Sequence, residues 1–492
     1  MAGVWVVVGG AESGGLLVRE GAGLSSPKEP QRLSHGAVVR ELEQEGERLR
    51  YKLLEGDGPE TGWVSVRLQA KRLVVPAVPD AVMAGREGGR QVGEAAPAMT
   101  FYAISDVHVE CRQNLQWLQE LPRFERSAIL VAGDLGVSLR QIREALLLFR
   151  QKFDHVFYCF GNHECWAHES AGDEDFAAFS DSFGKLEVLR SVCEEVGAHT
   201  TPQLIAGVWV VPVLGWYHGS WDTEPPLQPP LGRQLAQQPR SGAELATDTH
   251  VCKWRGLANG SEALAQEMDR QNELWGVWPL PAGLRAELGL PRGERRPVVS
   301  FSHFLPRLEL MPEKRFLFQP GLAQVVGSDF VRRRVDELRP DLHVFGHTHF
   351  PWDMTLDGVR YRSWPLGMPD EQARRIMSYP TQHTERWHPL PVFDSDGSHY
   401  RGDEACWFSL MYTRIPREPL SCRMASYVAK RYCPDAPVVP DGIISHGEFV
   451  EPSTDEEWWR RVAYWSHATE SARNKSRPER KCGASPEAHR KK

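Results

Sequence analysis

Five short β-rich runs lie within the first 75 residues, and clusters of Gly, Ser and Pro separate them. They read VWVVV, GLLVRE, AVVREL, RLRYKLL and GWVSVRL. In the fourth run, Leu49, Tyr51 and Leu53 alternate with polar residues, which is the period of a strand buried on one face. The stretch GDGPETGWVSV is typical of a hairpin that leads into a buried Trp63. The pattern predicts a small all-β domain over residues 1–75.

A different pattern begins near Met99, after a stretch rich in Pro, Gly and Ala at 76–98 that is typical of a linker. Apolar runs end at polar clusters and give way to helical spacing. Leu139, Ile142, Leu146 and Phe149 keep this spacing behind a possible N-cap, and a second such series ends before Gly197. The alternation predicts an α/β domain with buried parallel strands.

The rest of the chain is less regular. A Pro-rich insertion at about 219–296 contains one helical stretch, SEALAQEMDRQNELW, and could cover a site as a lid. Strand-like runs then resume, and DMTLDGVRYRSW predicts a hairpin that turns at Asp357 and Gly358. We place the end of the second domain at 465, although 380–465 hold no motif that we can interpret. Residues 466–492 form a basic tail, for which we expect disorder.

Composition narrows the class of protein. The chain has 492 residues, 41% of them hydrophobic and 25% charged, with a net charge of -7, so no global attraction to nucleic acid or anionic membrane is expected. Its nine cysteines contain no CxxC pair, and no apolar run is long enough to span a bilayer. We therefore expect a cytoplasmic location and no membrane partner.

Carboxylate, amide and imidazole side chains follow the ends of the predicted strands. Because the carboxyl ends of parallel strands share one edge of a sheet, these groups can converge across more than two hundred residues. Oxygen and imidazole ligands without thiolate suit Mn, Fe or Zn. If the backbone is extended, the side chains of Asp106 and His108 in DVH would lie on the same side of the chain, and so would those of His347 and His349 in HTH. The candidates are Asp106, His108, Asp134, Asn162, His163, His303, His347 and His349.

The order and spacing of these blocks resemble the calcineurin-like metallophosphoesterase superfamily, whose pattern is DxH, GD, GNH(D/E), H and GHxH. All five blocks are present in order between about 100 and 375. The resemblance implies an α/β fold, a layered β-sandwich flanked by helices. It also implies two divalent metal ions bridged by Asp134. One ion would be held by Asp106, His108 and His349, and the other by Asn162, His303 and His347.

The resemblance further implies a reaction, in which a hydroxide shared by the two metals attacks phosphorus in line. His163 would then act at the leaving group as general acid or transition-state donor, with Asp134 as the second catalytic residue. Glu164 could begin the following helix, and His343 is interpreted as a packed strand residue. His218 and Lys253 are candidate substrate contacts, although a structural role is the simpler interpretation of both.

The first 75 residues resemble an SH3b-like barrel, which is either a folding appendage or a docking module for a protein ligand. Specialised subclasses of the superfamily are disfavoured: position 137 is Val where purple acid phosphatases have a metal-binding Tyr, and GDLGVS lacks the Arg of protein phosphatases. We therefore predict a hydrolase of small phosphomonoesters or phosphodiesters. The alternatives are a nuclease recruited through the basic tail and a catalytically idle metal-binding scaffold that acts through the barrel.

Overall fold

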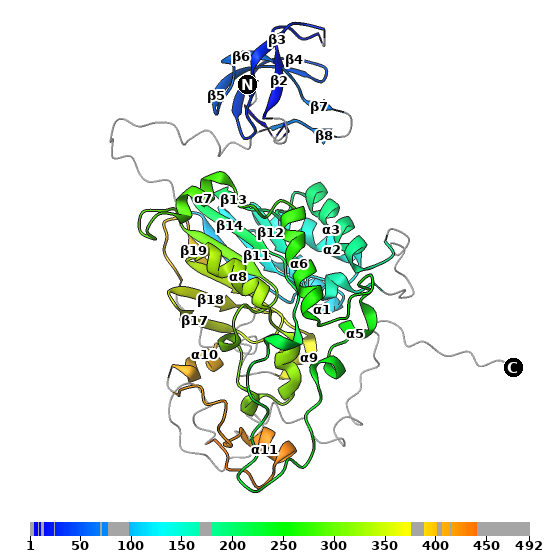
Figure 1. Cartoon of the computed structure of the whole chain (residues 1–492), viewed down its shortest axis with the longest axis vertical. Helices are drawn as coiled ribbons and strands as arrows, with labels where there is room; N and C mark the ends of the chain where they lie inside the picture. The colour runs from blue at the N-terminus through cyan, green and yellow to red at the C-terminus, as the bar shows by residue number, and fades with distance from the viewer. Residues whose placement is uncertain are drawn as a thin grey trace, which may run out of the picture. The chain divides into compact units, whose positions relative to one another are not determined.

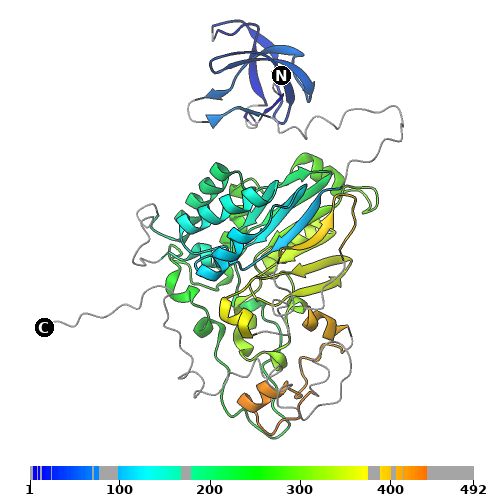
Figure 2. The ribbon, with the colours of Figure 1, turned by 180° about the vertical axis from the view of Figure 1, so that it is seen from behind.

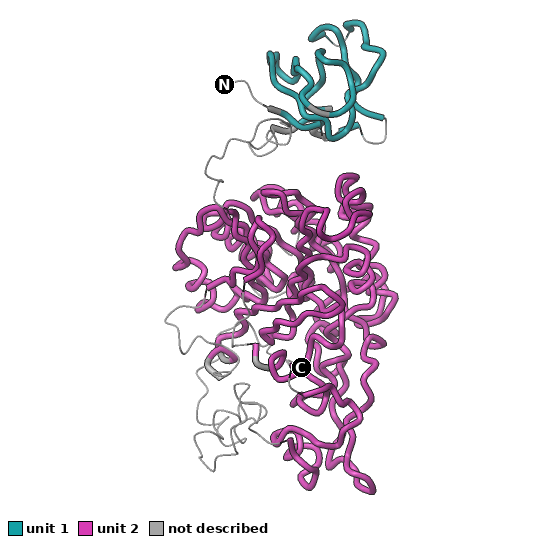
Figure 3. The backbone as a smooth tube through the Cα atoms, turned by 90° about the vertical axis from the view of Figure 1, so that its left-hand side faces the viewer, with its two compact units in different colours: residues 1–95 teal, residues 96–492 magenta. Residues whose placement is uncertain are grey.

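The protein is described by a computed structural model, which covers residues 4–7, 9–10, 14–23, 25–68, 71–76, 98–167, 179–374, 388–400, 406–413 and 415–439. The chain divides into two compact units, residues 1–95 and 96–492 (Figure 3). The predicted linker, apart from its end residues 76 and 98, and the predicted basic tail at 466–492 lie outside the described residues. In the part of the chain that is described, no helix is both long and apolar enough to cross a bilayer.

The N-terminal unit is all-β, as predicted, and every strand pair in it is antiparallel. Leu49 and Tyr51 are fully buried in its core, and Trp63 is nearly so. The seven-stranded sheet has the order β3 (Lys28–Leu33), β2 (Leu16–Arg19), β6 (Thr61–Ser65), β5 (Arg48–Glu55), β4 (Val38–Glu45), β1 (Val4–Val7) and β9 (Val74–Pro76). A short ribbon pairs β7 (Arg67–Leu68) with β8 (Lys71–Arg72).

Strand β3 was not predicted. Its sequence, KEPQRL, has no apolar run, and all of its side chains but Leu33 are at least partly exposed. The strand lies at an edge of the sheet, where Pro30 is tolerated because an edge strand need not donate every backbone hydrogen bond.

Two sheets face each other in the second unit (Figures 1 and 2). Strands β10, β11 and β12 pair in parallel, as do β14, β15, β16 and β18, whereas the remaining strands join antiparallel at the edges. The first sheet has the order β12 (His155–Cys159), β11 (Ser127–Ala132), β10 (Thr100–Ile104) and β19 (Leu390–Asp394). The second has the order β13 (Gln203–Ile205), β14 (Val208–Val213), β15 (Val298–Ser302), β16 (Leu342–Phe345), β18 (Val359–Ser363) and β17 (Trp352–Leu356).

An apolar layer fills the space between the sheets, and helices cover their outer faces. Phe101 and Leu130 of the first sheet share this layer with Phe301 and Val344 of the second. Figure 2 shows the helices on the first sheet, α1 (Arg112–Glu120), α2 (Leu139–Lys152) and α3 (Ser182–Val196). Figure 1 shows those on the second, α6 (Glu262–Leu274), α7 (Ala282–Leu288) and α8 (Asp329–Leu338). The predicted layered β-sandwich flanked by helices is confirmed.

The helix boundaries follow local signals in the sequence. Ser138 and Gln141 form a capping box at the start of α2, and Gly197 ends α3 in a left-handed conformation with φ 76°. Ser261 caps α6, the helix predicted inside the Pro-rich insertion. The shorter helices are α4 (Gly242–Leu245), α5 (Asp248–Val251), α9 (Pro369–Arg374), α10 (Trp407–Tyr412), α11 (Ser426–Tyr432), and the 3-10 turns His163–Cys165, Gly219–Trp221, Leu308–Leu310, Lys314–Phe316 and Pro320–Val325.

Candidate active site

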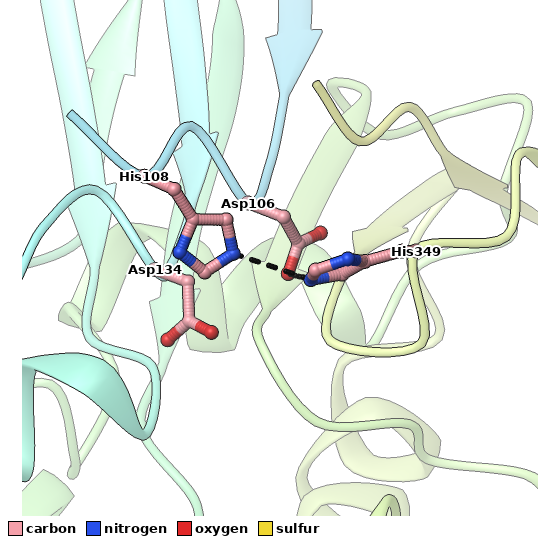
Figure 4. Close-up of side chains that lie close together, drawn as sticks. All are labelled: Asp106, His108, Asp134 and His349. Atoms are coloured by element: carbon pink, nitrogen blue, oxygen red, sulfur yellow. Dashed lines mark hydrogen bonds and ion pairs between the residues drawn. The ribbon is translucent and has the colours of Figure 1, made fainter. Parts of the chain in front are cut away.

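The structure brings together side chains that follow five parallel strands from both sheets. Within the described residues, three groups of ligand atoms form in which the atoms lie within 4.8 Å of one another: one consists of His108, Glu110 and His163, and the other two share Asp134. The two groups that share Asp134 are the candidate metal-binding groups, called here the first and the second group. The first adds Asp106, His108 and His349, which point toward one another in Figure 4, and the second adds His303 and His347. The convergence expected from strand order is therefore present.

Unusual backbone conformations aim these side chains. Five site residues have a positive φ of 50–72°, a region that residues other than Gly seldom occupy. The extended backbone that we expected for the DVH and HTH pairs is therefore wrong, because each pair lies in a tight loop just after its strand. Such strain is typical of functional sites. The five residues are Asp106, His108, Asp134, His347 and His349.

Two glycines of the sequence motifs lie so close to site side chains that no larger residue would fit in their place. A Cβ atom on Gly133 would collide with the His303 ring, and one on Gly161 would collide with the Asp134 carboxylate. The Gly of the GD block and the Gly of the GNHE block therefore let the loops come close enough to assemble the site.

Both histidines of the first group are held by outer carboxylates. His108 Nδ1 lies 3.1 Å from Glu110 Oε1, and His349 Nδ1 lies 2.5 Å from Glu371 Oε2. Because a carboxylate accepts the proton of each outer nitrogen, the inner nitrogen of each ring is an acceptor whenever the ring is neutral. These two inner Nε2 atoms lie 3.2 Å apart (Figure 4). Facing acceptors repel each other unless a cation or a proton lies between them.

Negative charge in this group attracts a cation. Burial lowers the pKa of His349, but the carboxylates of Glu371 and Asp106 outweigh it and hold the pKa well above its usual value. Burial, Glu164 and Asp106 raise the pKa of Asp134. A divalent cation would take the place of the protons that these groups otherwise retain.

The second group has the same arrangement with backbone carbonyls as the outer partners. His303 Nδ1 lies 3.0 Å from Ala132 O, and His347 Nε2 lies 2.8 Å from Val325 O. The inner atoms, His303 Nε2 and His347 Nδ1, each lie 3.0 Å from Asn162 Oδ1 and from one another. Burial lowers the pKa of both imidazoles, which favours their neutral, ligating form. Three converging acceptors define a second cation position.

The donor set therefore fits two divalent cations that share Asp134. It consists of carboxylate, amide and imidazole atoms without thiolate, which suits hard or borderline ions. The structure itself carries no ions, so the fit rests on these donor atoms and on the orientation of the four rings.

His163 lies beside both groups and belongs to the 3-10 turn after β12. Its Nδ1 faces Glu110 Oε1 at 3.3 Å and its Nε2 lies 3.7 Å from Asp134 Oδ2. Trp166 stacks on the ring, with centroids 3.9 Å apart and an angle of 26°. Burial and the neighbouring His108 lower the pKa of His163 despite the opposing effect of Glu110.

Glu164 does more than begin a helix, which was our expectation from the sequence. Its fully buried carboxylate accepts hydrogen bonds from the backbone N–H groups of Asp134, Leu135 and Gly161 at 3.1, 2.7 and 2.6 Å. It also accepts the Tyr158 hydroxyl at 2.7 Å. Glu164 thus ties the GD loop to the GNHE loop.

The other histidines named from the sequence have structural partners. His218 is 2% exposed; its Nδ1 lies 2.8 Å from Ser220 Oγ, and its Nε2 accepts the N–H of Asp329 at the start of α8. These contacts support the structural interpretation over a substrate contact. His343 is fully buried between Ser300 and Ser302, as expected of a packed residue.

Lys253 is exposed, and its backbone binds Ser182 at the start of α3. This contact anchors the insertion to α3. Its role as a substrate contact stays a prediction.

Sequence reasoning missed three carboxylates that support the site. Glu110 follows His108 by two residues, so the DVHVE spacing could have indicated it. Glu371 and Asp248 lie in segments without a recognisable motif, and only the fold reveals them. All three contact a side chain of the cluster.

Comparisons with known proteins agree with this geometry. The sequence model of the calcineurin-like phosphoesterase family matches residues 99–351, and the chain belongs to that family. The match covers the whole stretch from β10 to the loop after β16. The protein is therefore a metal-dependent hydrolase of phosphoester bonds.

The individual proteins that match the chain have low sequence identity to it. The chain is 26% identical over 302 residues to the [acyl-carrier-protein] phosphodiesterase PptH of Mycobacterium tuberculosis, a match that covers 60% of this chain and 85% of that protein. The crystal structure of the phosphopantetheinyl hydrolase PptH from the same organism matches with a TM-score of 0.41 and 23% identity, covering 56% and 93% of the two chains. A structure from Thermus thermophilus matches with a TM-score of 0.27 and 11% identity, covering 54% and 89%.

Proposed function

We propose that the two groups of ligand atoms form a dinuclear metal centre that hydrolyses phosphodiesters. The observation that carries the proposal is the orientation of the four imidazoles, each with its outer nitrogen tied to an oxygen and its inner nitrogen facing the cluster. Mn, Fe or Zn fits this donor set. Asp106, His108 and His349 would hold one ion, Asn162, His303 and His347 the other, and Asp134 both.

When bound, the two ions would supply positive charge for the phosphate and lower the pKa of the attacking water. The protein's own groups then place and protonate the leaving group. Glu110 Oε1 lies 3.3 Å from Nδ1 of His163, and Nε2 of the same ring is directed toward the cluster near Asp134. We infer that the imidazolium form of His163 donates its Nε2 proton to the leaving oxygen, and that the nearby Glu110 carboxylate stabilises this charged form. Asp134 keeps the two ligand groups together, because its carboxylate is shared between them.

We infer the substrate class from the similarity to the [acyl-carrier-protein] phosphodiesterase. The natural substrate would be a phosphodiester, and an acyl-carrier protein in its phosphopantetheinyl form is the first candidate. We also propose a reducing, cytoplasmic location, since the eight cysteines within the described residues are thiols rather than disulfides. Recruitment of a protein ligand by the N-terminal unit stays a prediction.

The proposal predicts that metal loading creates activity and that Asp134 is required for it. Full-length protein stripped of metal and reloaded with Mn²⁺ should hydrolyse bis(p-nitrophenyl) phosphate, and more slowly p-nitrophenyl phosphate. Asp134→Asn should lower kcat by at least about 10³-fold, as expected when a group that acts at the reaction centre is lost. Release of p-nitrophenol measures both rates. Activity that persists in excess chelator, or in Asp134→Asn, would contradict the proposal.

A further inference from the structure

One carboxylate of the Pro-rich insertion contacts the candidate metal site from outside. Asp248, the first residue of α5, is 3% exposed. Its Oδ1 accepts hydrogen bonds from Asn162 Nδ2 at 3.0 Å and from Trp166 Nε1 at 2.6 Å. Its Oδ2 accepts the Tyr217 hydroxyl at 3.0 Å. Three residues that border the site thus converge on one buried side chain.

The first contact fixes the direction of the Asn162 amide. A side-chain amide has a donor end and an acceptor end, and only its oxygen can bind a cation. Because Asp248 can only accept, it holds the NH₂ end away from the cluster. The oxygen then faces His303 Nε2 and His347 Nδ1, both at 3.0 Å. Without Asp248, either orientation of the amide would be accessible, and one would point donors at the cation.

The second contact supports the candidate general acid. Trp166 stacks on His163 with the centroids 3.9 Å apart, and the indole N–H is held by Asp248. The third contact involves Tyr217, whose ring lies 6.3 Å from that of His347 at an angle of 22°. Asp248 therefore supports the second cation position through Asn162 and Tyr217, and it supports His163 through Trp166.

We propose that Asp248 is a positioning residue that completes the second half of the metal centre, so that the insertion is a structural part of the active site rather than a lid alone. This inference rests on the proposed function. Asp248 acts through Asn162: it presents the amide oxygen to the cation and itself touches neither metal nor substrate. Outer partners of metal ligands typically change metal affinity by about 10- to 100-fold.

The test measures metal binding rather than turnover. Isothermal titration calorimetry with Mn²⁺ on the metal-stripped full chain should show two sites. Asp248→Asn should weaken one of them by about 10- to 100-fold and leave the other unchanged. The matched control is Asp269→Asn, the same substitution in the same insertion, at an aspartate that pairs with Arg334 at 2.8 Å. It should bind both ions as the wild type does.

A double-mutant cycle separates positioning from general destabilisation. If Asp248 acts through Asn162, then Asn162→Ala and the double variant with Asp248→Asn should bind Mn²⁺ equally well. Additive losses, or an Asp248→Asn variant with two unchanged sites, would overturn the proposal. Should Asp248→Asn fail to fold, Tyr217→Phe is the second variant, because it keeps the Asp248 carboxylate and removes only one of its hydrogen bonds. It should weaken the site that contains Asn162 by less than the about 10- to 100-fold expected for Asp248→Asn. A wild-type chain that binds no Mn²⁺ would instead overturn the proposed function itself, and this inference with it.

Discussion

At the scale of single residues, the function of each histidine is decided by what its two ring nitrogens contact. The four histidines of the cluster each tie one nitrogen to an oxygen and turn the other inward. His343, only four residues before His347, instead has Ser300 Oγ at 2.8 Å from Nδ1 and Ser302 Oγ at 3.0 Å from Nε2. With hydroxyls on both sides, it has no free nitrogen to offer a metal.

The buried His343 predicts a pH dependence of stability. Burial lowers its pKa to about 3, below the unfolded value near 6.5, so the unfolded chain binds the extra proton first. Stability from this residue is therefore full above pH 6.5 and is lost as the pH falls toward 3, on the order of 3 kcal/mol by pH 4. His343→Gln should be less stable than the wild type at pH 7, and this difference should shrink by pH 4.5.

Urea unfolding of both proteins at the two pH values measures that difference. A stability gap that is independent of pH would contradict the account of His343. Mn²⁺ binding serves as the control, since His343→Gln should retain both sites.

At the scale of elements, local signals decide where helices begin. Ser138 Oγ accepts the N–H of Gln141, and Gln141 Oε1 accepts the N–H of Ser138 at 3.3 Å. Ser138→Ala removes half of this capping box and should lower the free energy of unfolding by about 1 kcal/mol. Ser191→Ala, in the exposed interior of α3, is the matched control and should be neutral or slightly stabilising. Equal effects of the two substitutions in urea titrations would exclude a role for the cap.

The sequence predicts those helices, strands and turns whose signals are local. Helix α2, the 357–358 hairpin and the strand ends that carry the cluster all follow from apolar spacing and turn residues, because those signals are local. Strand β3 was missed since an exposed edge strand needs no apolar run. The left-handed backbone at Asp106 and His108 was also missed, because contacts with the neighbouring loop hold it in place. His108 N–H, for example, donates to Asp134 O at 3.0 Å.

At the scale of the whole chain, the site depends on the meeting of two sheets. The first sheet supplies Asp106, Asp134 and Asn162 from its strand ends, and the second supplies His303 and His347. The insertion adds Asp248, and α9 adds Glu371. Neither sheet alone holds a complete set of ligands for either cation position, so the fold of the second unit is a condition for metal binding.

The most direct test of this account is the location of bound metal. Crystals of the full chain grown with Mn²⁺ should give two anomalous-scattering peaks on either side of the Asp134 carboxylate. One peak should contact His108 and His349, and the other His303 and His347. A single peak, or peaks away from these histidines, would contradict the dinuclear site.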